Sequence, residues 1–121
     1  MAKLDEKAKK AIREIHPAFI ATADKNGKPN VSAKGSLSVF DDEHVLFADI
    51  ASPRTVTNIK ENPQVALICL DAASRKSCRI WGKGEIISSG ELFDKIAAQI
   101  AGMNMKVNNV VMVAVDEVEV S

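Results

Sequence analysis

The sequence is poor in aromatic residues and in cysteine. Its 121 residues include no tyrosine, one tryptophan and four phenylalanines, so a broad aromatic platform for stacking a large substrate is not expected. The two cysteines, Cys69 and Cys78, are too few for a disulfide framework, and their spacing is not that of a metal site. We therefore expect neither a disulfide-stapled fold nor a metal centre.

Net charge of one sign is also absent. Sixteen basic residues balance sixteen acidic ones, which gives no support to a nucleic acid or a membrane as a partner attracted by bulk charge. No apolar run approaches the roughly 20 residues that a membrane-spanning helix needs, and the opening "MAKLDEKAKK" is not that of a signal peptide. We expect one cytoplasmic domain over residues 1–121, long enough to bury its own core.

Short apolar runs bounded by turn residues make up most of the chain. Sequential hairpins with few aromatics predict a mainly β fold, a small antiparallel β-barrel of six strands with flanking helices. One helix begins after Ser52, ends at Asn62-Pro63 and separates the third strand from the fourth. The other predicted helices are 3–15 and 90–102, and the predicted strands are 18–23, 30–39, 45–50, 64–70, 78–87 and 110–120.

The second predicted strand, "NVSAKGSLSV", alternates clearly. Its odd-numbered positions from Val31 to Val39 are apolar or glycine, and its even-numbered positions from Asn30 to Ser38 are polar. Such a period of two is typical of a half-buried strand. We expect the odd-numbered residues to face the core and the polar ones to face outward.

The segment "DIASPRTVTNIKENP" contains a helix start with an unusual charge. Ser52 is a good N-cap and Pro53 suits the first helical position, but Arg54 follows, although this end of a helix already carries a partial positive charge. A bound anion between the guanidinium and the free N–H donors would explain the arginine. The alternative is that Arg54 is solvated and Ser52 only caps the helix.

The same helix has an apolar side. Val56 and Ile59 share it at helical spacing and should face inward. Arg54 and Asn58 should then project outward, with Thr55 on the flank.

The order of these segments, "NVSAKGSLSV", "LFADIASPRTVTNIKENPQVAL" and then "RIWGKGEI", resembles the pyridoxamine 5'-phosphate oxidase-like family of FMN-binding split barrels. The resemblance covers roughly residues 17–90, between an N-terminal helix over 1–16 and a helix plus last strand over 91–121. It implies a six-stranded antiparallel split barrel that forms a homodimer, with FMN in the groove between the subunits.

The resemblance also implies a set of cofactor-binding residues, with no metal and no identified catalytic side chain. Those assigned to the FMN phosphate are Ser52, Arg54 and Thr55, supported by Asn58 and flanked by Ala48 and Asp49. Those assigned to the flavin ring and ribityl chain are Ser32, Lys34 and Ser36, with the backbone of Ala33 and Gly35 at the pyrimidine edge. Lys34 there would favour the anionic reduced flavin; the alternative is a solvated lysine at the sheet edge.

Trp81 is the second unusual residue. Alternation places it on an outer face between the cations Arg79 and Lys83, which is typical of an interface anchor. We expect the Trp81 face to help form the dimer and to touch the partner's flavin. The alternative is that Trp81 covers the edge of its own barrel. His16 and His44, by contrast, have no sequence neighbour that suggests a catalytic base.

These features predict an FMN-binding flavoprotein, a small flavin-dependent oxidoreductase with an unidentified redox partner or small-molecule substrate. Vitamin B6 oxidation is not expected, because the final "VDEVEVS" is not an arginine-rich segment. The first alternative is a non-enzymatic FMN-binding electron-transfer or storage protein, and the second is a dimeric scaffold without a cofactor. A deazaflavin could replace FMN, whereas haem is less expected, since neither histidine lies in the predicted groove.

Overall fold

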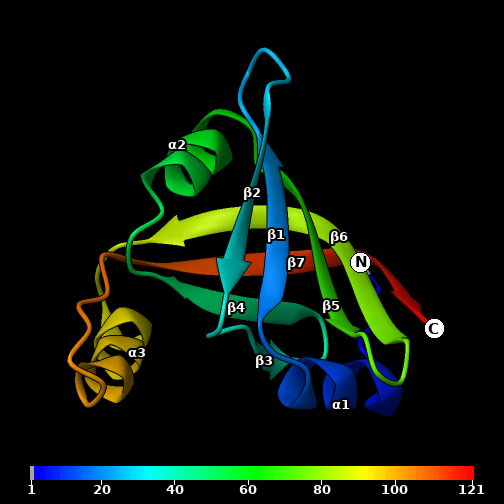
Figure 1. Cartoon of the computed structure of the whole chain (residues 1–121). Helices are drawn as coiled ribbons and strands as arrows, with labels where there is room; N and C mark the ends of the chain where they lie inside the picture. Colours follow the sequence, from blue (N-terminus) through cyan, green and yellow to red (C-terminus); the bar gives the residue numbers. More distant parts are fainter. Residues whose placement is uncertain (1) are drawn as a thin grey trace.

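A computed structural model describes residues 2–121 and contains one antiparallel seven-stranded sheet flanked by three helices (Figure 1). The mainly β architecture is therefore confirmed. The strand order is β2-β1-β5-β6-β7-β4-β3, so β2 and β3 form the two edges. The strands are β1 Ala18–Ala23, β2 Pro29–Lys34, β3 Ser38–Asp41, β4 His44–Asp49, β5 Gln64–Asp71, β6 Lys76–Ile87 and β7 Asn109–Val120, and the helices are α1 Glu6–Glu14, α2 Pro53–Glu61 and α3 Glu91–Ala101.

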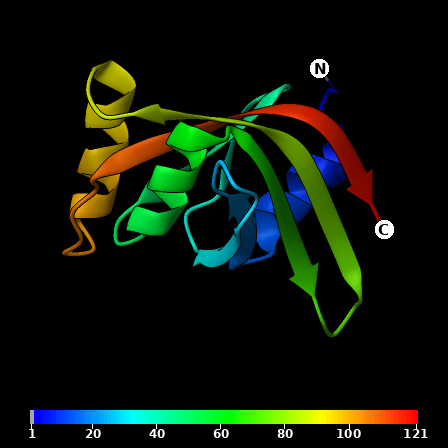
Figure 2. The ribbon, with the colours of Figure 1, turned by 90° about the horizontal axis from the view of Figure 1, so that it is seen from above.

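Strong curvature brings the two halves of the sheet across one another. Figures 1 and 2 show β1, β2 and β5 crossing the direction of β7 and β4, while the long strands β6 and β7 run through the middle. The β6–β7 register shifts between Trp81 and Gly82. A Cβ on Gly82 would lie 2.2 Å from the carbonyl oxygen of Ala114, so only glycine permits this close approach at the bend.

The prediction of six strands is wrong by one, because the chain turns in the middle of "NVSAKGSLSV". Residues 35–37 leave the sheet, and β2 and β3 lie at its opposite edges. The Ser36 hydroxyl accepts a hydrogen bond from the Ala48 N–H of β4, at 2.9 Å, and stabilises this turn. Helix α2 consequently lies between the fourth and fifth strands rather than between the third and fourth.

The orientation predicted for residues 30–34 is also wrong, although their period of two is right; after the turn, Leu37 is buried in the core and Ser38 is exposed, as predicted. Lys34 is only 7% exposed, whereas Val31 is 67% exposed and Ala33 is exposed too. Within residues 2–121, strand β2 pairs only with β1, and α2 packs against β1, β2 and β6. The polar side of β2 is therefore the covered one, and its apolar side joins an exposed apolar face of the sheet.

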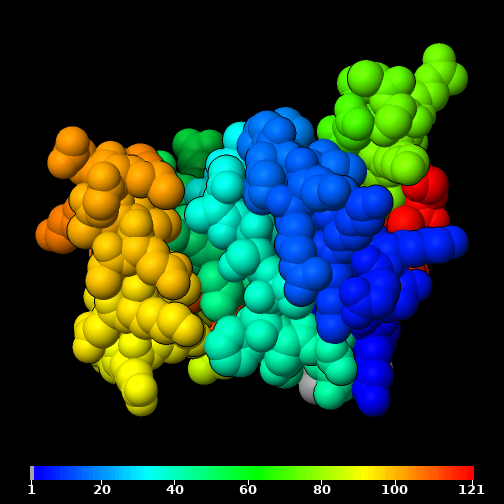
Figure 3. Space-filling view, turned by 90° about the horizontal axis from the view of Figure 1, so that it is seen from below, coloured from blue at the N-terminus to red at the C-terminus, as the bar shows by residue number. Residues whose placement is uncertain are grey.

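Helices α1 and α3 cover two separate apolar clusters. Helix α1 buries Ala8 and Ile12 against the main core, and Asp5 caps it by accepting a hydrogen bond from the Ala8 N–H at 2.8 Å. Helix α3 and its following loop lie at the other end of the molecule (Figure 3), over a smaller cluster that includes Ile100 and Val110. None of the helices in residues 2–121 is long and apolar enough to cross a membrane.

Helix α2 has the predicted apolar side but a different polar side. Val56 and Ile59 are buried as expected. Asn58 was expected to project outward, yet it is 6% exposed and donates a hydrogen bond from Nδ2 to Thr22 Oγ1 at 3.1 Å. Thr55 is fully buried rather than on the flank. Asn58 faces the sheet because α2 packs against β1, whose covered side includes the Thr22 hydroxyl.

Candidate functional site

The start of α2 lies where β2, β4 and β7 approach one another. Ser52 is the N-cap residue, as predicted, but its side chain makes no capping hydrogen bond, and the first turn contains no acidic residue. The first helical bond runs from the Val56 N–H to the Ser52 carbonyl at 3.2 Å. The preceding N–H groups of Arg54 and Thr55 therefore have no partner within the helix.

The Ser52 hydroxyl is instead the centre of a polar network that joins four elements. It accepts a hydrogen bond from Lys34 Nζ at 2.5 Å and donates one to Asp49 Oδ1 at 2.7 Å. The Ser52 N–H donates to the same carboxylate oxygen at 3.0 Å. On the other side, Asn109 Nδ2 donates to Asp49 Oδ2 at 2.9 Å. Both oxygens of Asp49 are thus engaged, and α2 is tied to β2, β4 and β7.

This network contains a buried pair of opposite charges. Burial alone would raise the pKa of Asp49, but hydrogen bonds from Asn109 and Ser52, together with the charge of Lys34, outweigh burial and lower it below its usual value. Burial lowers the pKa of Lys34, and the nearby Asp49 carboxylate opposes that shift. The ammonium also lies 5.6 Å from the centre of the Phe47 ring. Lys34 is therefore buried, and the alternative prediction of a solvated lysine at the sheet edge is wrong.

Thr55, in the first turn of α2, has a buried and unsatisfied hydroxyl. The side chain is fully buried, and Oγ1 has no hydrogen-bond partner among residues 2–121. An unsatisfied buried polar atom costs about 1–3 kcal/mol. Next to it, Arg54 is exposed and forms no ion pair with any described residue. A free cation, an orphaned hydroxyl and two N–H groups in one turn together fit an anionic group.

The other residues of β2, its following turn and α2 that were predicted to bind FMN lie outside the Ser52 network. Ser32 and Ser36 are half-buried, with Ser36 bonded to the Ala48 backbone as described above, while Ala33 and Gly35 are exposed. Asn58 holds α2 on β1 and is committed to Thr22. The sequence did not reveal Asn109, because its role depends on pairing with Asp49 across β4 and β7.

Trp81 lies on the exposed apolar face, away from this network. Two rows of directly paired residues cross the face, and all of them except Ala33 line a groove of about 290 Å³. Trp81 is half-buried, with the Arg79 guanidinium 5.7 Å from its ring and bonded to Glu119 at 2.6 Å. Since β6 is an inner strand, Trp81 does not cover a sheet edge. The first of the two rows across this face contains Val31, Ala21, Ala66 and Trp81. The second contains Ala33, Phe19, Ile68 and Arg79.

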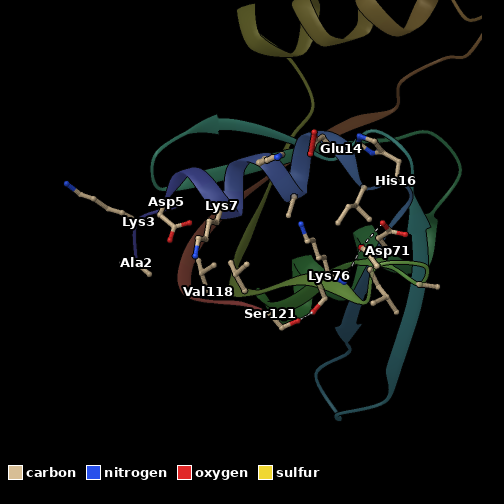
Figure 4. A pocket seen from close by; sticks show the side chains of 18 residues that line it. Ala2, Lys3, Asp5, Lys7, Glu14, His16, Asp71, Lys76, Val118 and Ser121 are labelled. Carbon is tan, nitrogen blue, oxygen red and sulfur yellow. Dashed lines mark hydrogen bonds between the residues drawn. The ribbon is translucent and has the colours of Figure 1, made fainter.

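A larger open cavity, of about 1220 Å³, lies between α1 and the ends of β5, β6 and β7. Figure 4 shows Lys7 and Lys76 in the space between α1 and these strand ends, with Asp5, Glu14 and Asp71 around it. None of the predicted cofactor-binding residues lines this cavity. Its cations and anions are mixed, so its size alone does not make it the functional site.

The cysteines and histidines lie outside the network. Cys69 is in the core, as predicted, directly opposite Cys78. Burial raises the pKa of both thiols to about 11, so neither is a thiolate nucleophile at neutral pH. His44 contacts Asp41 at 2.8 Å in the β3–β4 turn. Among residues 2–121, no three His, Cys, Asp or Glu side chains gather as metal ligands would.

The solved structures that this chain resembles have different ligands in their names. An FMN-binding protein from Syntrophomonas wolfei is 20% identical, with a TM-score of 0.86 over 97% of this chain and 85% of its own. HutZ, the heme storage protein of Vibrio cholerae, is 23% identical, with a TM-score of 0.70 over 98% and 94%. An F420 reductase, 20% identical, has a TM-score of 0.69 over 92% and 94%. At these identities the likeness shows a shared fold.

Sequence comparison covers more of the chain than residues 17–90. An uncharacterized protein of Methanocaldococcus jannaschii is 38% identical in an alignment of 102 positions that covers 78% of this chain and 68% of that protein. The family model described as pyridoxamine 5'-phosphate oxidase matches residues 4–120. This match includes the Ser52 network and the flanking helices α1 and α3, and the chain therefore belongs to the pyridoxamine 5'-phosphate oxidase family.

Proposed function

We propose that this protein is a small FMN-binding flavoprotein, acting as a flavin-dependent oxidoreductase, with the FMN phosphate at the start of α2. The observation that carries the proposal is the buried Thr55 hydroxyl, which has no partner among the described residues, in a first turn that also offers Arg54 and two N–H groups without a helical partner. A helix start favours a phosphate through both its N–H donors and its dipole. The phosphate would supply the acceptor that Thr55 lacks.

The residues that we assign to the phosphate differ from those that the resemblance implied. Ser52 already donates its only hydroxyl hydrogen to Asp49. We therefore assign direct phosphate contacts to Arg54, Thr55 and the first-turn N–H groups. Ser52, Asp49 and Asn109 hold the start of α2 in position.

The flavin ring would lie along β2 and the turn that follows it. Ser32 and Ser36 offer hydroxyls there, and the exposed residues Ala33 and Gly35 would offer backbone hydrogen bonds to the ring's pyrimidine edge. Bound FMN would supply the hydride or electron chemistry, while this chain binds and orients the cofactor. The name of the FMN-binding protein from Syntrophomonas wolfei supports this cofactor, and the names of the heme and F420 proteins define the competing ones.

Vitamin B6 is not the substrate that we propose. The last residues of β7 are acidic, with Asp116, Glu117 and Glu119 exposed. They offer no cation to the phosphate of a vitamin B6 substrate, as an arginine-rich segment would. A smaller or less charged substrate, or a redox partner protein, suits this surface better.

The exposed apolar face is proposed as the interface of a homodimer, with FMN in the groove between subunits. Phe19 and Val31 are 41% and 67% exposed on this face. A contiguous apolar face of this kind is typical of an interaction site. Trp81, packed under Arg79, is the aromatic anchor such an interface uses.

A non-enzymatic electron-transfer or storage protein is the second candidate. It is favoured by the polar network itself: the two buried charged side chains beside the proposed phosphate site, Lys34 and Asp49, are linked to each other through Ser52. No other described side chain at the start of α2 is placed as an acid or base.

The phosphate site is tested with Arg54→Ala. The purified protein should show the absorption bands of oxidised flavin and should bind FMN more tightly than riboflavin. The substitution should weaken FMN binding by about 2 kcal/mol, on the order of 30-fold, and leave riboflavin binding nearly unchanged. Arg13→Ala, in the last turn of α1, is the matched control. Equal affinities of the unaltered protein for FMN and riboflavin would contradict the proposal.

Thr55→Val separates a ligand-binding hydroxyl from a structural one. Removing an unsatisfied buried hydroxyl should raise the free energy of unfolding of the flavin-free protein by about 1 kcal/mol. The same change should weaken FMN binding about tenfold. Urea unfolding and FMN titration measure the two effects, with the exposed Thr57→Val as control. If FMN affinity does not change, Thr55 does not bind the phosphate.

The dimer is tested by light scattering on Trp81→Ala. Loss of a buried aromatic anchor should weaken self-association by about 2 kcal/mol or more, so the variant should dissociate at concentrations where the unaltered protein is dimeric. Met103→Ala, an exposed apolar residue in the loop after α3, should have no effect. A monomeric unaltered protein would refute the interface.

Anaerobic addition of NADH or NADPH distinguishes an enzyme from a carrier. For an oxidoreductase, we expect rapid loss of the oxidised flavin absorbance of the loaded protein. Reduction that requires an added partner protein would instead identify the second candidate. A purified protein that is colourless and takes up no FMN would indicate a scaffold without cofactor.

A further inference from the structure

Lys34 reaches the phosphate end of the proposed site rather than the ring end. It is the last residue of β2, and its Nζ lies 2.5 Å from the hydroxyl of Ser52, the N-cap of α2. The resemblance had placed Lys34 at the pyrimidine edge of the flavin. In the structure its side chain extends from the sheet to Ser52 at the start of α2. Ser52 precedes Arg54 by two residues in the chain.

The Lys34 ammonium has unused hydrogen-bonding capacity. An ammonium has three N–H donors, and among the described residues its only hydrogen-bond partner is Ser52 Oγ. Two donors are therefore available on a side chain that is only 7% exposed. Such a group gains more from an incoming anion than a solvated lysine does, because little water has to be displaced from it.

Asp49 opposes this gain. It is 3% exposed, it accepts from both the backbone and the hydroxyl of Ser52, and Asn109 fixes its other oxygen. The carboxylate thus occupies an anionic position at the helix start before any ligand arrives. It neutralises Lys34 through Ser52 and would repel a phosphate docked at Arg54 and Thr55.

We propose that Lys34 and Asp49 together set the anion preference of this site, Lys34 by donating to the ligand phosphate and Asp49 by weakening that contact. This inference rests on the proposed function. It assigns Lys34 to selection of phosphorylated over unphosphorylated flavin, and Asp49 to limiting how tightly the phosphate is held. Without Asp49, the helix start would carry two cations and no counter-charge.

The measured quantity is the phosphate preference, defined as the riboflavin dissociation constant divided by the FMN dissociation constant. Lys34→Met should lower it about tenfold, because a charged hydrogen bond to the phosphate is lost. Asp49→Asn keeps the shape of the side chain, removes the repulsion and should raise the preference about threefold or more. Lys60→Met, at the exposed far end of α2, should not change it.

The redox potential of the bound flavin tests the competing position of Lys34. If its ammonium lies at the ring edge, Lys34→Met will lower the potential for forming the anionic reduced flavin and leave the phosphate preference unchanged. That result would overturn the inference. A lowered phosphate preference with little change in potential supports it.

Failure of this inference is distinguishable from failure of the proposed function. If the unaltered protein shows no phosphate preference, both fail. If the preference exists and Arg54→Ala lowers it while Lys34→Met does not, the phosphate site stands and only the role of Lys34 is refuted. Should Lys34→Met not fold, Asp49→Asn decides, since an unchanged or lowered phosphate preference in that variant refutes the inference.

Discussion

The contact between Asp49 and Ser52 is the constraint on which the candidate site depends. Strand β4 ends at Asp49 and α2 begins four residues later at Pro53, so one carboxylate can hold the backbone and the side chain of Ser52 together. Asn109 secures it from β7, and Lys34 approaches from β2. The position of the first turn of α2 is therefore determined from three strands at once.

The same network leaves the first turn of the helix unsatisfied. Because Ser52 is committed to Asp49 and Lys34, it does not cap α2. In the same turn, the buried hydroxyl of Thr55 has no partner among the described residues. Unsatisfied polar groups of this kind reduce stability, and they are expected where a ligand completes the structure. The helix start is thus rigidly placed and chemically incomplete, which is the combination that a phosphate site requires.

The curved sheet separates the two surfaces that the proposed function needs. The covered side of β2 faces α2 and carries the polar network, while the opposite side of β2, β1, β5 and β6 carries the apolar face with Trp81. A single strand, β2, contributes to both surfaces through its alternating residues. Cofactor binding and self-association can therefore be neighbouring functions of one edge of the sheet.

Local signals in the sequence were sufficient for most of the elements and for the unusual helix start. Alternation predicted the strands and Ser52-Pro53 predicted where α2 begins, because these features depend on residues close together in the chain. The anion site that Arg54 indicated stays a prediction. Only the tertiary structure decided which side of β2 is buried, that Asn58 turns inward, and that Lys34, Asp49 and Asn109 meet. Those outcomes depend on which distant elements pack together: α2 covers the polar side of an edge strand, and β7 pairs with β4, so partners far apart in the sequence determine the environment of each charge.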